Sequence, residues 1–112
     1  MKRALFLMAA GAIYAGLLVL HRPHAQQAPP SRAQFDKGEE LFSAICSHCH
    51  GPQMVNPGTV SFDLRKFPHD DEARFMNSVR NGKNNMPPWK DVLKPDEIDA
   101  LWAYVRTGGK EP

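Results

Sequence analysis

The sequence predicts a small all-α domain built from three to four helices. Apolar residues recur at helical spacing in two separate stretches, 35–45 and 98–105, and glycines that can end a helix follow both. No stretch alternates apolar and polar residues as a half-buried strand does, and no internal repeat is present. The 112 residues are enough for one such domain.

The first 28 residues have the pattern of an export segment. A basic start (residues 1–3) precedes an uncharged apolar run (residues 4–20), which is typical of a bacterial signal peptide. The run is long for a signal core and short for a membrane-spanning helix, so a retained N-terminal anchor stays open as the alternative. We expect residues 29–112 to fold in the periplasm, free or at the periplasmic face of the inner membrane, with membrane contact only if the segment is retained.

The charge of the domain argues against binding to nucleic acid. The chain has 14 Lys and Arg residues and 12 Asp and Glu residues. Three of the 14 (Lys2, Arg3 and Arg22) lie in the export segment, so the domain keeps 11 basic residues against 12 acidic ones. A nucleic-acid-binding domain needs a basic stripe on its folded surface, and this balance offers none.

The first helix is predicted to run from Ser31 to the Gly51-Pro52 pair. It has an apolar stripe at helical spacing, formed by Phe35, Leu41, Phe42 and Ile45. After a loop over residues 53–68, acidic residues suit the N-terminus of a second helix over 70–80, which Asn81-Gly82 ends.

The last helix has the strongest periodicity. Pro95 suits a first helical position, and apolar residues recur at i, i+3, i+4 and i+7, namely Ile98, Leu101, Trp102 and Val105. Gly108-Gly109 ends the helix.

The run Cys46-Ser47-His48-Cys49-His50 holds the only two cysteines of the chain. This spacing is the attachment pattern of a c-type haem, in which two thiols form thioether bonds and the next histidine ligates the iron. A thioredoxin-like pair would need strand–helix alternation, and a zinc site would need a second Cys/His pair; neither is visible. The sequence therefore predicts one covalent haem c held by Cys46 and Cys49, with His50 as an axial ligand.

Three methionines compete for the second axial position. Met54 follows His50 by four residues, and four extended residues reach only about 14 Å, too little to pass around a porphyrin. Met76 falls inside the second predicted helix, where packing is the better interpretation. Met86 lies in a later loop and is followed by two prolines, so it is the predicted ligand.

His/Met ligation predicts the type of chemistry. It raises the reduction potential of a haem c, and it leaves no open position for a substrate. We therefore expect a carrier of single electrons and not an enzyme. A haem-based gas or redox sensor with a labile sixth position is the alternative from a different class.

The residues from Cys46 to Gly51, followed by Met86-Pro87 and a terminal helix, resemble a class I cytochrome c. The resemblance covers residues 34–107 and implies crossed N- and C-terminal helices around one haem. It implies that two pairs of residues pack where these helices cross, namely Gly38 and Phe42 against Leu101 and Tyr104. It also implies that a proline carbonyl accepts a hydrogen bond from the proximal imidazole, and Pro57 or Pro52 is the candidate.

The loop from Asn84 to Trp89 is similar to the distal loop of bacterial members that serve periplasmic quinoprotein dehydrogenases. The implied partners are a dehydrogenase as donor and an oxidase or another cytochrome as acceptor, with the protein itself a monomer. Four cations flank this loop, namely Arg80, Lys83, Lys90 and Lys94. They form either a solvated face or a surface that steers an acidic redox partner.

Overall fold

The computed structural model describes residues 27–56, 58 and 61–112. The predicted apolar run at residues 4–20 lies outside them. Within the described residues the elements are α1 (Arg32–Leu41), η1 (Phe42–Cys46), α2 (Ser47–His50), η2 (Pro52–Met54), η3 (Leu64–Lys66), α3 (Glu72–Asn81) and α4 (Pro95–Arg106). These ranges contain no strand beyond one isolated bridge, and none of their helices is long and apolar enough to cross a membrane. The all-α prediction is confirmed.

The predicted first helix is continuous from Arg32 to His50, but its middle is not α-helical. Ser31 caps it reciprocally: Ser31 Oγ accepts from the amide of Gln34 at 3.2 Å, and Gln34 Oε1 accepts from the amide of Ser31 at 3.2 Å. The turn η1 is π-helical, and the amide of Ser47 bonds to the carbonyl of Phe42, five residues back. The helix ends at Gly51, whose φ of 82° favours glycine.

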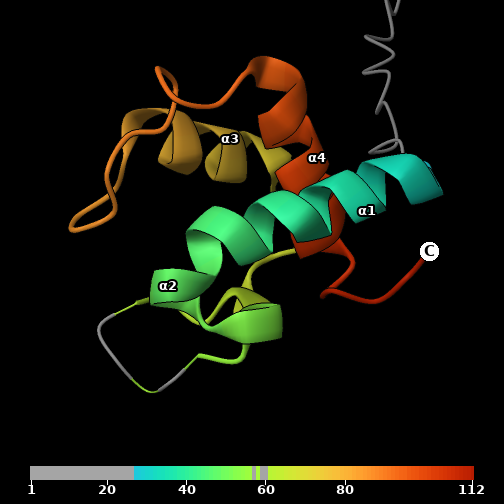
Figure 1. Cartoon of the computed structure of the whole chain (residues 1–112), viewed down its shortest axis with the longest axis horizontal. Helices are drawn as coiled ribbons and strands as arrows, with labels where there is room; N and C mark the ends of the chain where they lie inside the picture. The colour runs from blue at the N-terminus through green and yellow to red at the C-terminus, as the bar shows by residue number, and fades with distance from the viewer. Residues whose placement is uncertain (1–26, 57, 59–60) are drawn as a thin grey trace, which may run out of the picture.

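Helices α1 and α4 cross in contact, as Figure 1 shows. Gly38 permits the approach, because a Cβ atom there would lie 2.0 Å from the carbonyl oxygen of Ala100. The ring of Tyr104 packs against Phe35 and Phe42, with centroids 5.4 and 5.2 Å apart. The predicted contact of Tyr104 thus agrees with the structure. The backbone of Ala100 also faces Gly38, and Leu101 lines a cavity together with Phe42.

Helix α4 is the centre of the core. Every residue from Ala100 to Val105 is buried, because α1 and α3 cover different faces of the helix. Its N-terminus has no Ser or Thr cap; instead the carboxylate of Glu97 accepts from the amide of Lys94 at 2.9 Å. Phe67, Phe75 and Trp102 form an aromatic cluster beside it.

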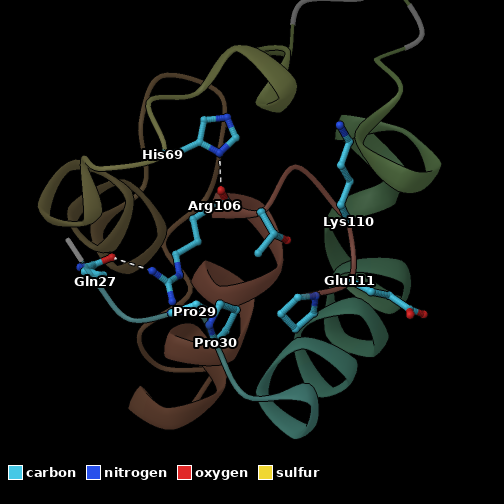
Figure 2. A pocket seen from close by; sticks show the side chains of 9 residues that line it. Gln27, Pro29, Pro30, His69, Arg106, Lys110 and Glu111 are labelled. Atoms are coloured by element: carbon cyan, nitrogen blue, oxygen red, sulfur yellow. Dashed lines mark hydrogen bonds between the residues drawn. The ribbon is translucent and has the colours of Figure 1, made fainter.

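The arm from Gln27 to Pro30 lies against the C-terminal end of α4 (Figure 2). Gln27 Oε1 accepts from Trp102 Nε1 at 3.3 Å and from Arg106 Nη1 at 3.2 Å. The carbonyl of Arg106 also bonds to the ring of His69. These groups surround a small cavity of about 290 Å³, which shares no lining residue with the larger one described below.

Candidate functional site

A cavity of about 450 Å³ lies between α3, the loop after α3, α4 and the turns η1 and α2, which carry the cysteine–histidine motif. Its walls are mostly apolar and come from elements far apart in sequence: Phe42, Ile45, Phe62, Leu64, Phe67, Phe75, Val79, Trp89, Leu93, Leu101 and Val105. This size and lining are typical of the site of a small organic ligand or cofactor.

The cysteine–histidine motif forms one wall of this cavity. Cys46, Cys49 and His50 all line it, with Cys46 and His50 half-buried and Cys49 exposed. His48 lies between them and does not line it; its Nε2 lies 3.2 Å from the carbonyl oxygen of Ala44. The motif therefore presents two sulfurs and one imidazole to the same space.

The imidazole of His50 is oriented by the loop that follows the motif. Its Nδ1 donates to the carbonyl oxygen of Phe62 at 3.0 Å, which leaves Nε2 as the unprotonated nitrogen that can bind a metal. Ser61 Oγ donates to the carbonyl of Cys49 at 2.6 Å and holds this loop beside the motif. Phe62 and not Pro52 is thus the acceptor, while Pro57, the other predicted candidate, lies outside the described residues. The acceptor is a backbone oxygen, which every residue has, so no sequence signal could have selected Phe62.

Of the methionines in the described residues, Met86 alone lines the cavity. It belongs to a tight turn in which Lys83 and Met86 exchange two backbone hydrogen bonds, of 3.0 and 2.9 Å. Met54 is fully buried in the core elsewhere, and Met76 packs at the edge of the core. Gly82 allows the turn to close, because a Cβ there would lie 2.7 Å from the carbonyl oxygen of Met86.

The electrostatics of the cysteines do not suit thiol redox chemistry. Burial, with a smaller contribution from Cys49, raises the pKa of the Cys46 thiol to about 11. Reactive cysteines have lowered pKa values, so this thiol would be a poor nucleophile at neutral pH. In the described part of the chain, no group of three or more His, Cys, Asp or Glu side chains is arranged to hold a metal ion.

The cavity also carries positive charge that the sequence did not reveal. Arg74 from α3 and Lys83 from the following turn line it, and no Asp or Glu does so among the described residues. The sequence does not distinguish Arg74 from other exposed helix residues, because its position at the cavity depends on how α3 packs in the fold. Arg80, Lys90 and Lys94 are exposed, and the amide of Lys90 donates to the carbonyl of Arg80 at 3.4 Å.

Comparison with known proteins decides the family. Residues 33–105 match the protein family described as "Cytochrome C oxidase, cbb3-type, subunit III". A cytochrome c6 from Nostoc sp. is 35% identical over 85 residues, which cover 72% of this chain and 77% of the relative. The chain belongs to the class I c-type cytochromes.

Solved structures agree with this cytochrome fold. Cytochrome c6C from Synechococcus sp. PCC 7002 is 28% identical with a TM-score of 0.50, covering 64% of this chain and 93% of that one. The c-type cytochrome NirC is 22% identical with a TM-score of 0.54 over 74% of this chain and all of that one, a likeness of fold alone. The predictions of one covalent haem c, and of an electron carrier rather than an enzyme, are confirmed by the relatives.

The residues that surround the cavity of this cytochrome fit a haem. The walls offer an apolar enclosure, the motif offers two thiols and a metal-binding nitrogen, and Met86 offers a thioether sulfur. Arg74 and Lys83 supply charge that is complementary to the two carboxylates of a porphyrin.

Proposed function

We propose that this cytochrome carries single electrons between redox proteins of the periplasm, with His50 and Met86 as the axial ligands of its iron. Cys46 and Cys49 would form the thioether bonds. The observation that carries the proposal is that one cavity of about 450 Å³ is lined by both cysteines, by His50 and by Met86, while Met54 and Met76 lie outside it.

The chemistry follows from these ligands. The hydrogen bond to Phe62 fixes the tautomer of His50, so its Nε2 is the nitrogen available to the iron. A thioether donates less charge to ferric iron than a nitrogen ligand does and so favours the reduced state. If His50 and Met86 both hold the iron, no ligand position would remain for a substrate, and the haem would supply one-electron exchange.

The experiment compares Met86→Ala with Met76→Ala in the haem-loaded protein. Met86→Ala should give a high-spin iron that binds carbon monoxide when reduced, whereas Met76→Ala should keep the low-spin spectrum of the wild type. An unchanged spectrum in Met86→Ala would refute the assignment. Carbon monoxide binding by the wild-type protein would favour the gas-sensor alternative.

The partners are proposed to be a quinoprotein dehydrogenase as donor and a terminal oxidase or another cytochrome as acceptor. Two relatives support this choice: a quinohemoprotein alcohol dehydrogenase of Pseudomonas putida, 31% identical over 12% of its length, and a cbb3-type oxidase subunit FixP of Azorhizobium caulinodans, 32% identical over 30% of its length. Stopped-flow mixing with a substrate-reduced quinoprotein dehydrogenase tests the donor. Rapid reduction of the haem is expected, and no reduction on the timescale of turnover would exclude this donor class.

The export segment is proposed to end near residue 28, and the domain to comprise residues 29–112. Gln27 and Ala28, at the end of this segment, both accept hydrogen bonds from Arg106, so cleavage after residue 28 would remove these contacts and a retained segment would keep them. The mass of the secreted protein measures the cleavage point directly, and a mass that includes residues 4–20 would indicate a retained anchor.

A further inference from the structure

A bound haem would bring two negative charges to the cavity, and the cysteine–histidine motif does not compensate them. A haem carries two propionate carboxylates, and a carboxylate placed against apolar walls is strongly destabilised unless a cation or several donors accompany it. The side-chain cations that line the described cavity are Arg74 and Lys83, apart from the imidazole of His50.

The guanidinium of Arg74 lies over two aromatic rings that line the cavity. Its guanidinium carbon lies 5.0 Å from the ring centroid of Phe67 and 5.7 Å from that of Phe62. These cation–π contacts hold the guanidinium beside the rings, and its N–H groups can still donate to a planar carboxylate. Lys83 has no comparable support, since no ring contact or ion pair holds its ammonium group among the described residues.

Two acidic residues of the neighbouring segments, Asp71 and Asp63, are engaged elsewhere. The carboxylate of Asp71 accepts from the backbone amide of Arg74 at 3.2 Å and caps α3, and the carboxylate of Asp63 is held by Arg65 at 2.9 Å. Among the described residues no carboxylate lies within 4.0 Å of the Arg74 guanidinium. The N–H groups of Arg74 are therefore free to bind a carboxylate of the cofactor.

We propose that Arg74 pairs with a haem propionate and thereby raises the reduction potential of this cytochrome. The inference rests on the haem site proposed above and adds a residue to it. The same loop residue, Phe62, both supports the guanidinium of Arg74 and accepts the hydrogen bond of His50. Arg74 is thus a positioning and charge-compensating residue and does not touch the iron.

The test compares the midpoint potential of the holoprotein in the wild type, Arg74→Gln, Arg74→Lys and Lys83→Gln as a function of pH. At pH 7, Arg74→Gln should leave the propionate unpaired and shift the ferrous-to-ferric equilibrium toward ferric by roughly fourfold to fifteenfold, the effect of one unit charge at about 10 Å and an effective dielectric constant of about 20 to 40. Arg74→Lys should recover part of this shift, and Lys83→Gln should produce a smaller one.

The pH profile separates pairing from mere proximity of a charge. If the propionate loses its partner, it protonates near the ordinary carboxyl range of about 4 to 5, and the difference between Arg74→Gln and wild type then disappears at low pH. If Arg74 is an unpaired cation, the difference stays constant with pH. In the holoprotein the two cysteines would be thioethers and His50 an iron ligand, so Lys83 is the titratable group beside Arg74 that remains in the described lining of the cavity. Asp63, which pairs with Arg65, and Asp71, which caps α3, are present in both proteins.

The outcomes are decisive in both directions. A difference that is largest at neutral pH and vanishes at acid pH supports the proposal. A constant difference, no difference, or a pH-dependent one in Lys83→Gln alone overturns it. A failure of the haem site itself would look different, because the wild type would then lack the low-spin spectrum before any Arg74 variant is compared. Far-UV circular dichroism of each variant shows that the fold is intact.

Discussion

Gly38→Ala should destabilise the protein, although alanine is the better helix former. The added Cβ would lie 2.0 Å from the carbonyl oxygen of Ala100 and 2.9 Å from Cβ of Tyr104, whereas ordinary contacts are 3.4 to 4 Å. The obstacle at Ala100 is a backbone atom of a buried helix, so no side chain can turn away to relieve it. Helices α1 and α4 would have to move apart by more than 1 Å, judged from about 2.0 Å against at least 3.4 Å.

The magnitude follows from two opposing terms. Overpacking of this kind costs about 3 kcal/mol at the upper end of the usual range. The higher helix propensity of alanine returns about 1 kcal/mol. The net loss is therefore about 2 kcal/mol, which lowers the midpoint of thermal unfolding by roughly 8 to 16 °C in a domain of this size.

The assay is thermal unfolding of the holoprotein, followed by far-UV circular dichroism and by haem absorbance. Lys37→Ala is the matched control, because Lys37 is the exposed neighbour on α1 and pairs only with Glu40 at 3.4 Å. Its midpoint should stay close to that of the wild type, since exposed pairs contribute about 0 to 1 kcal/mol. A Gly38→Ala protein as stable as the wild type, or more stable, would refute the close helix crossing.

The remaining predictions concern the cofactor and the charged surface. The protein produced without haem should be unfolded or molten, because the cavity of about 450 Å³ would then be unfilled in a domain of marginal size. A cooperative thermal unfolding transition of the haem-free protein near that of the holoprotein would contradict this. If the exposed cations near Met86 steer an acidic partner, the double variant Lys90→Glu with Lys94→Glu should slow electron transfer about tenfold at low ionic strength and weaken its dependence on salt. The control Lys110→Glu, beside the small cavity, should change neither. Electron-transfer rates of the wild type that do not depend on salt would rule out steering.

Local signals in the sequence predict the helices well. Ser31, the acidic residues before α3, and Pro95 each mark a helix start that the structure places within two residues. The positive φ angles at Gly51 and Gly82 follow the helices that these glycines end. Such signals act through hydrogen bonds to the nearest turn, so neighbouring residues alone determine them.

Contacts between distant segments are less predictable. The carbonyl oxygen of Phe62 is the acceptor for His50 because of the path of the loop. Every residue has a backbone oxygen, so the residue type gives no signal for this contact. The carbonyl oxygen of Ala100 lies opposite Gly38 because the rotation of α4 about its axis depends on packing against both α1 and α3. In each case the spacing predicts that elements meet, while the three-dimensional packing decides which atoms meet.

The π-helical turn explains how one helix serves both the helix crossing and the haem cavity. At 100° per residue, an uninterrupted α-helix would place His50 about 80° around the axis from Phe42, which packs on Tyr104 and lines the cavity. A π-turn accommodates about one extra residue and rotates everything after it back by roughly 90°. His50 thereby returns to the direction of Phe42, so the stripe that binds α4 continues into the motif that faces the cavity. The helical spacing of apolar residues in the sequence predicts the stripe, but only the longer hydrogen bond from Ser47 to Phe42 accounts for the alignment of its final residue.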